Sequence, residues 1–540
     1  MAGILDRFSG PEQLSGLDAS FVYPETARTP MHIGAVAISD PSTAPGGKVR
    51  HNDVLTFVED RLHLAKTFRQ KLANVPMGVD HPYWVDDAEF DIEYHVRHIA
   101  LPAPGDWRQL CILAARLHSR PMDLSKPLWE FTIVEGLDNV KGVPKGAYAV
   151  ISKVHHAAID GVSGVDISQA VHSLEPNDEA PEPETPWVPA RQPSRLELLT
   201  RAQINNAVQP LRAMDVMRRT APGALKLLTG LGRGDIKRGN TRVPRTRFNK
   251  TVSSHRVFEG RSFSLDDIKE IRKRLPGSTV NDVILAVCGG ALRKYLKAKN
   301  ELPSESLIAM APISVRSEGE KGNLGNQVAA MSVELGTHIA DPLARLHYVH
   351  ENANNSKAMT KALGAREMAE ASKLAPAMIS GVSARLYTRL GLANRISPMF
   401  NTVITNVPGP QVPLYMNGAK LVAQFGQGPL YDGMGLIHPV FSYCGSITVS
   451  FNAGREMMPD PEFYAECLQE SFDDLRKEAS SRKKKAPRRG KKNDAGTAAT
   501  TTNGHTDSFA FLKAPAGEPD DLKKIKGVGV ALETKLNDLG

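Results

Sequence analysis

The stretch AYAVISKVHHAAIDG, residues 147–161, decides how this sequence is best interpreted. Its first half, Tyr148 to Val154, is rich in valine and isoleucine, which predicts a β-strand. His155 and His156 follow where that strand should leave its sheet. The Gly-Val-Ser-Gly segment after Asp160 predicts a turn into a helix. The pattern therefore predicts two imidazole rings at the end of a strand.

A histidine in this position can take a proton from a hydroxyl or a thiol, because its ordinary pKa of about 6.5 lies close to neutral pH. Asp160 can order the turn by pairing with a cation, and Gly161 lets the backbone bend without a Cβ clash. A single histidine at a strand end is more often an ordinary polar group that is satisfied by hydrogen bonds. The complete His-His-three-Asp-Gly pattern nevertheless favours a catalytic role.

The string resembles the HHxxxDG motif of the CoA-dependent acyltransferase superfamily. That superfamily includes chloramphenicol acetyltransferase-like enzymes, peptide-synthetase condensation domains and bacterial wax ester synthase/diacylglycerol acyltransferases, and the motif alone does not choose among them. Five further blocks, in one order, resemble the wax ester synthase/diacylglycerol acyltransferase family from about Leu14 to Asp474. The blocks are Leu14 to Ile38, the Pro-Leu-Trp block Ser125 to Leu137, the Asn-Asp block Ser278 to Leu296, Ala311 to Gln327, and Thr405 to Tyr415.

The resemblance implies an α/β fold with two chloramphenicol acetyltransferase-like lobes and a central channel, with the histidines at its centre. A chain of 540 residues is long enough for two cores. Leu196 to Leu231 has helical periodicity, with Pro210 and Pro222 expected to break it. The predicted divisions are an N-terminal lobe (1–174), a Pro- and acid-rich linker with crossover helices (175–250), a C-terminal lobe (251–480), a disordered basic linker (481–517) and a small helical tail that resembles part of a helix-hairpin-helix (518–540).

The superfamily resemblance also implies roles for single residues. It places the general base on His156, whereas His155 supports the turn or contacts the substrate directly. Asp160 is expected to be a structural anion, with Arg316 of the other lobe as its candidate partner; an ordinary surface charge explains Arg316 equally well. Asn281 is a candidate donor to the oxyanion, although it can equally be a helix-start residue.

No Gly-rich phosphate loop, zinc-ligand spacing or nucleophile elbow occurs in the sequence. We therefore expect no metal and no covalent acyl-enzyme. Acyl-CoA is expected to be a co-substrate bound in the channel, by residues that the sequence does not identify. Trp129, in the Pro-Leu-Trp block, is expected to be a packing anchor rather than a reactive group.

The charge distribution argues against nucleic acid as a partner of the folded body. The formal net charge is +8, and residues 482–492 hold eight basic groups and no acid, so the remainder of the chain is neutral. Nucleic-acid binding stays open for the tail alone.

Four widely spaced cysteines favour a reducing compartment, and no signal peptide or membrane-spanning stretch is expected. We expect a cytoplasmic protein, peripheral to the inner face of the membrane or to lipid inclusions.

The sequence therefore predicts an O-acyltransferase that moves a long-chain acyl group from acyl-CoA to diacylglycerol, to a long-chain alcohol, or to both. The products are triacylglycerol and wax ester. Two alternatives stay open: a condensation-like transferase that uses a carrier-bound thioester, and a catalytically silent scaffold that binds lipid or nucleic acid.

Overall fold

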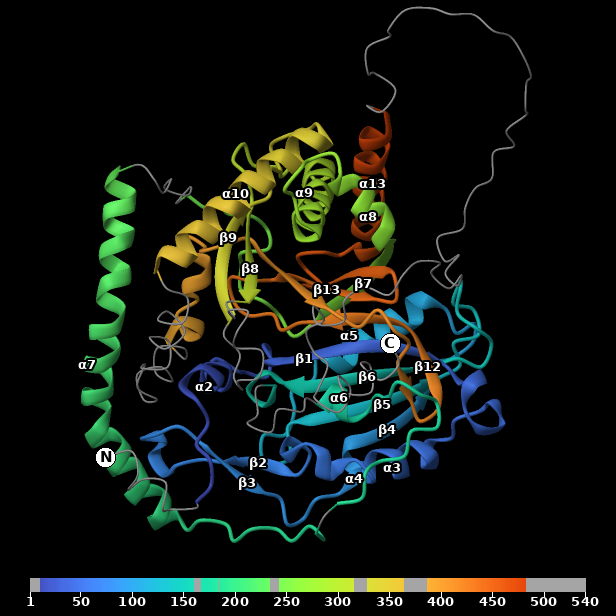
Figure 1. Ribbon diagram of the computed structural model, residues 1–540, viewed down its shortest axis with the longest axis vertical. Helices are drawn as coiled ribbons and strands as arrows, with labels where there is room; N and C mark the ends of the chain where they lie inside the picture. Colours follow the sequence, from blue (N-terminus) through green and yellow to red (C-terminus); the bar gives the residue numbers. More distant parts are fainter. Residues whose placement is uncertain are drawn as a thin grey trace, which may run out of the picture.

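Two six-stranded sheets, one above the other in Figure 1, organise the protein into two α/β lobes. The structure is a computed structural model, and it describes residues 10–159, 167–183, 185–233, 242–314, 328–363 and 386–481. The predicted two-lobed α/β fold is confirmed. The basic linker and the helical tail that the sequence predicts lie outside the described residues.

The first sheet contains the predicted histidine strand. Its strands lie in the order β11 (Tyr415–Met416), β12 (Ala419–Gln427), β1 (His32–Asp40), β6 (Tyr148–His155), β5 (Trp129–Glu135) and β4 (Val96–Ala100). Strand β6 pairs antiparallel with β1 and β5, so that His155 lies opposite His32. Strands β11 and β12 come from the C-terminal half of the chain, and β12 pairs antiparallel with β1. The second half of the chain thus contributes strands to the first lobe's sheet, and the predicted domain limits stay a prediction.

The second sheet supports the other half of the site. Its strands lie in the order β7 (Arg256–Ser264), β14 (Ser446–Gly454), β13 (Leu436–Tyr443), β10 (Thr402–Pro408), β8 (Ile308–Ser314) and β9 (Val328–Glu334). Strands β13 and β14 form an antiparallel hairpin, and both contact β12 where the two lobes meet. A smaller sheet of β2 (Gln70–Ala73) and β3 (Tyr83–Asp86) flanks the first lobe.

The helices cover these sheets. They are α2 (Gly16–Val22), α3 (His51–Glu59), α4 (Ile92–His95), α5 (Trp107–His118), α6 (Ile167–Ala170), α7 (Arg195–Arg233), α8 (Leu265–Arg272), α9 (Val280–Ala298), α10 (Pro342–Leu363) and α13 (Pro461–Ser481). Helix α5 lies between the lobes and packs against β7 (Figure 1). Helix α9 is the centre of the second lobe's core. It carries Gly289 and Gly290 because a Cβ there would lie 2.3 Å from the carbonyl oxygen of Leu335 and 2.1 Å from Oγ of Ser471, respectively.

Trp129 is fully buried at the start of β5, beside the histidine strand. Its Nε1 donates a hydrogen bond to the carbonyl oxygen of Phe68 over 3.0 Å. The ring also stacks on His95, with ring centroids 4.5 Å apart. The prediction that Trp129 is a packing anchor is confirmed.

Helix α7 corrects one expectation. It runs without interruption from Arg195 to Arg233, as a long rod at one edge of the molecule (Figure 1). The prediction that Pro210 and Pro222 break it was wrong. A proline inside a helix removes one backbone hydrogen bond and favours a bend, but the remaining bonds can carry the helix onward.

Candidate functional site

The histidine pair lies where β6 passes into a short 3-10 turn, His156–Ala158. The backbone N–H of His155 donates to the carbonyl oxygen of Leu128, and that of His156 donates to the carbonyl oxygen of Met31, both over 2.9 Å. Because both backbones are held by neighbouring segments, the two rings leave the sheet in fixed directions.

The side chain of His155 is fully buried and makes two hydrogen bonds. Its Nδ1 accepts the backbone N–H of Ala157 over 3.1 Å, so the proton of the neutral ring must lie on Nε2. That nitrogen donates to Oε2 of Glu25 over 3.3 Å. The other carboxylate oxygen of Glu25 accepts the backbone N–H of Met31 over 3.2 Å. Both ring nitrogens are occupied, so His155 is suited to hold the turn rather than to move a proton.

His156 has different surroundings, because the residue is half-buried rather than fully buried and its ring stacks on the ring of Phe21 in α2. The centroids are 3.6 Å apart, and the planes differ by 7°. The pKa of His156 is lowered to about 4, mainly by burial and to a smaller extent by the neighbouring ring of His155, while a backbone hydrogen bond opposes the shift. The imidazole is therefore neutral at pH 7 and can accept a proton.

In the second lobe, the Asn-Asp block forms the start of α9. Thr279 caps the helix: its Oγ1 accepts the N–H of Asp282, and a carboxylate oxygen of Asp282 accepts the N–H of Thr279. The fully buried carboxylate also accepts a hydrogen bond from Nδ1 of His350, on α10, over 2.9 Å. Asp282 is thus fixed by the helix cap and by a half-buried histidine.

Asn281 turns toward strand β10. Its Oδ1 accepts a long hydrogen bond of 3.5 Å from Nδ2 of Asn406. Among the described residues, the amide nitrogen of Asn281 has no hydrogen-bond acceptor, so its two N–H groups are available to a ligand. The structure brings Asn281 and Asn406 together, but within the described ranges no hydrogen bond links Asn281 to His156.

Three predicted site residues, Asp160, Gly161 and Arg316, lie outside the described residues. Their roles stay predictions. In the part of the chain that the structure describes, no three histidine, cysteine or acidic side chains gather as metal ligands.

The sequence reasoning missed Glu25 and Phe21, the residues that distinguish the two histidines. Glu25 is 130 positions from His155, and its hydrogen bond is created by the fold. The available signal was the position of both residues within the opening block of the family resemblance.

Comparison with known proteins identifies the family. A family model described as wax ester synthase/diacylglycerol acyltransferase catalytic domain matches residues 14–284, and one described as WS/DGAT C-terminal domain matches residues 324–476. The chain belongs to the wax ester synthase/diacylglycerol acyltransferase family. The resemblance that the sequence blocks predicted is confirmed.

Relatives and solved structures agree with this assignment. Two Mycobacterium tuberculosis (strain CDC 1551 / Oshkosh) proteins carry the provisional name diacylglycerol O-acyltransferase. The first, MT1809, is 31% identical over 86% of this chain and 90% of its own length; the second, MT3172, is 34% identical over 80% and 90%. The solved wax ester synthase/diacylglycerol acyltransferase from Marinobacter aquaeolei VT8 is 25% identical, with a TM-score of 0.61 over 87% of this chain and 100% of that chain. A trichothecene 15-O-acetyltransferase from Fusarium sporotrichioides, 10% identical with a TM-score of 0.52 over 86% and 94%, shares the fold.

Proposed function

We propose that this protein is an acyl-CoA-dependent O-acyltransferase that esterifies diacylglycerol, a long-chain alcohol, or both, with His156 as the general base. Family membership supports the reaction class. The observation that carries the role of His156 is the contrast with its neighbour: both ring nitrogens of His155 are engaged, whereas His156 is neutral and partly accessible.

The chemical obstacle is that an alcohol is a poor nucleophile at neutral pH. As its oxygen attacks the thioester carbonyl carbon, His156 takes the hydroxyl proton, and the carbonyl oxygen becomes an oxyanion. When the tetrahedral intermediate collapses, the carbon–sulfur bond breaks, and the imidazolium returns the proton to the leaving sulfur as CoA thiol. A base of this kind contributes about 10²- to 10⁴-fold.

The oxyanion needs hydrogen-bond donors that are already in position. We assign this role to the amide nitrogen of Asn281, which Asn406 leaves without an acceptor by binding the other end of the carboxamide. Asp282 supports it by fixing the first turn of α9. We retain Asp160 and Arg316 as a proposed bridge between the lobes, with Gly161 giving the turn its freedom.

The test is purified protein with palmitoyl-CoA and either dioleoylglycerol or hexadecanol, with thiol release and ester formation followed together. We expect stoichiometric thiol and ester from at least one acceptor. Thiol release without ester, or neither product from folded protein, contradicts the proposed function.

We further propose that the protein associates peripherally with a membrane or a lipid inclusion through α7. No helix within the described ranges is both long and apolar enough to cross a bilayer. Four exposed apolar residues of α7 lie within an arc of about 80°, at 100° of rotation per residue. They are Leu196, Ile204, Leu211 and Met214. Leu198 and Ala202 are buried on the opposite side, and such an amphipathic helix suits a lipid–water interface.

Flotation with phosphatidylcholine vesicles tests this association. The triple variant Leu196→Ser/Leu211→Ser/Met214→Ser is expected to stay with the soluble fraction, while wild type floats. The control Thr200→Ala/Gln203→Ala changes polar residues on the same side of α7 and is expected to float. Flotation of the triple variant with wild type excludes this surface.

A further inference from the structure

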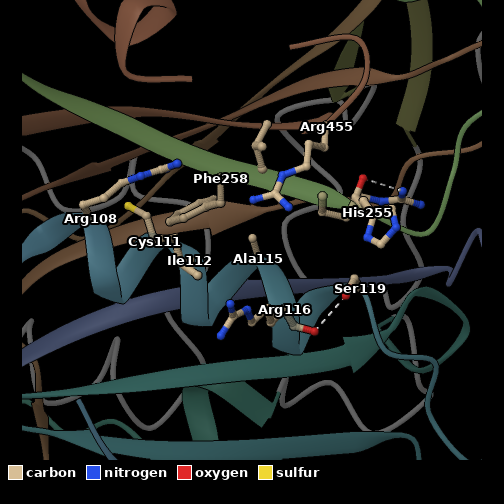
Figure 2. Close-up of a pocket in the computed structure, with 11 residues that line it drawn as sticks. Arg108, Cys111, Ile112, Ala115, Arg116, Ser119, His255, Phe258 and Arg455 are labelled. Atoms are coloured by element: carbon tan, nitrogen blue, oxygen red, sulfur yellow. Dashed lines mark hydrogen bonds between the residues drawn. The ribbon is translucent and has the colours of Figure 1, made fainter. Parts of the chain in front are cut away.

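A cavity of about 100 Å³ lies between the lobes, with α5 of the first lobe on one side and β7 of the second on the other (Figure 2). Its lining includes four arginines and no acidic residue. Arg108 and Arg116 come from α5, whereas Arg256 and Arg455 come from the second lobe. Figure 2 shows the guanidinium of Arg455 directed toward α5. None of the described residues with a proposed catalytic role lines this cavity.

The positive charges of the cavity are only partly neutralised. Arg108 forms an ion pair with Glu462, with Nε and Oε1 2.5 Å apart. Among the described residues, the guanidinium groups of Arg116 and Arg455 form no ion pair. Glu456, next to Arg455, attracts Arg256 at longer range, but its two carboxylate oxygens accept hydrogen bonds from the N–H and Oγ of Ser253 rather than from an arginine of the cavity.

Arg256 is the unusual member of the group, because the residue is only 8% exposed. It donates to carbonyl oxygens, including that of Arg28 over 2.5 Å, and forms no direct ion pair among the described residues. Burial lowers the pKa of Arg256 to about 10. Glu456 and Asp432 attract this guanidinium without contacting it, and they offset only part of the cost of its burial. A bound anion in direct contact relieves more of that cost.

A structural role explains only one of these arginines. Arg116 lies in the last turn of α5, where the helix dipole favours a cation. Arg256 and Arg455 reach the same cavity from the other lobe, and the four cations together far exceed the roughly half negative charge of a helix C-terminus. A phosphate group between the lobes can accept hydrogen bonds from both sides, and arginine is well suited to bind it.

The cavity is linked to the histidine strand through two sets of contacts. Ser119 lines it and follows His118, whose carbonyl oxygen accepts a hydrogen bond from Nε2 of His32, the residue opposite His155. Arg256 binds the carbonyl oxygen of Arg28, in the segment between Glu25 and β1. A ligand here therefore lies against the structure that orients His155.

We propose that this cavity binds a phosphate group of the acyl-CoA substrate and thereby draws the two lobes together. The inference rests on the proposed use of acyl-CoA. Cys111, Ile112, Ala115 and Phe258 give the cavity apolar walls beside its cationic rim. That combination suits a ligand in which phosphates adjoin an uncharged chain. A lipid headgroup carries the same chemistry, but it is presented on a flat surface, whereas this cavity lies between two lobes.

The test compares the double variant Arg116→Ala/Arg455→Ala with wild type by calorimetric titration. Both side chains are exposed and have no ion-pair partner among the described residues, so the fold should persist. Arg272→Ala/Arg389→Ala is the control: it removes the same charge from exposed arginines that do not line the cavity. Ligands are CoA, pantetheine, which has no phosphate, and inorganic phosphate as a competitor.

We expect the double variant to raise the Kd for CoA about tenfold or more, because hydrogen bonds to charged groups are lost. Pantetheine binding should be unchanged, and phosphate should weaken CoA binding to wild type but not to the variant. The control should bind CoA like wild type. An unchanged Kd for CoA, or an equal loss for pantetheine, overturns the proposal.

Vesicles of phosphatidylglycerol distinguish the other source of phosphate. We expect the double variant to float with them like the control. If the double variant no longer floats but binds CoA like wild type, the cavity binds a lipid headgroup instead of CoA, and the proposal is wrong. The titration measures binding and needs no turnover, so it tests the cavity separately from the reaction. If CoA binds through the cavity but no acyl transfer occurs, the proposed function is contradicted and the proposed binding site is retained.

Discussion

Two pairs of adjacent residues, one in each lobe, are built on the same plan. His155 and His156 end β6, while Asn281 and Asp282 begin α9. In each pair one side chain is fully buried and fixed: Glu25 binds His155, and in the second lobe His350 binds Asp282.

The second member of each pair keeps a side chain that can accept a proton or donate a hydrogen bond to a ligand. His156 contacts the ring of Phe21 and is neutral, and Asn281 has free amide protons among the described residues. Two adjacent polar residues of a motif can therefore have different roles: one fixes the backbone, and its neighbour contacts the substrate. Replacing the fixed residue should therefore lower mainly the stability of the protein, whereas replacing its neighbour should lower mainly the rate of the reaction.

The largest expected effect separates the two histidines. His156→Ala should lower kcat by about 10²- to 10⁴-fold, because the general base is lost. Its unfolding free energy should fall only by about 0.5–1.5 kcal/mol, the usual value of an aromatic pair. His155→Ala should instead cost about 1–3 kcal/mol of stability, because Glu25 loses a buried partner.

Thiol release and urea unfolding measure these two effects, and His347→Ala, at an exposed histidine of α10, controls for loss of an imidazole. If His156→Ala keeps wild-type kcat, or if His155→Ala alone abolishes turnover without loss of stability, the division of roles is wrong.

Asn281→Ala comes next. It should lower kcat by about 10²- to 10³-fold with little change in KM, because an oxyanion donor acts in the transition state. Asn406→Ala removes only the residue that orients Asn281, and it should cost about 1 kcal/mol in kcat/KM. Steady-state kinetics with palmitoyl-CoA measure both. A larger loss from Asn406→Ala than from Asn281→Ala would reverse the assignment.

An effect smaller than the loss of either reactive side chain concerns the buried carboxylate. Asp282→Asn weakens the helix cap and the hydrogen bond to His350, so the unfolding free energy should fall by about 1–3 kcal/mol. Adding His350→Ala should cost less than the sum of the single changes, because both remove one interaction. Asp266→Asn, at an exposed position of α8, should change stability by about 0.5 kcal/mol or less. Additive losses would show that the histidine and the carboxylate act independently.

The sequence was sufficient to predict those features that depend on neighbouring residues along the chain. The β-branched run before His155 predicted β6, and Thr279 with Asp282 has the spacing of a helix cap. The ordered blocks predicted the family. Each of these signals spans only a few residues or depends on resemblance, so folding was not needed to find it.

Contacts made by the fold were not predictable in this way. Glu25 meets His155 across 130 positions, and β12 crosses to the first sheet from the second half of the chain. The low pKa of His156 arises from burial, which a sequence does not reveal. Helix α7 passes through Pro210 because local breaking signals compete with the rest of the helix.

The most direct measurement of the central claim is the ratio of kcat/KM at pH 5 to that at pH 7.5, with the fold verified by circular dichroism at both. The base must be unprotonated, so activity falls only as pH drops through its pKa. With the pKa of His156 at about 4, we expect roughly nine-tenths of the activity to remain at pH 5. Retention of only about 3%, as for an ordinary histidine of pKa about 6.5, would contradict a base held neutral by burial.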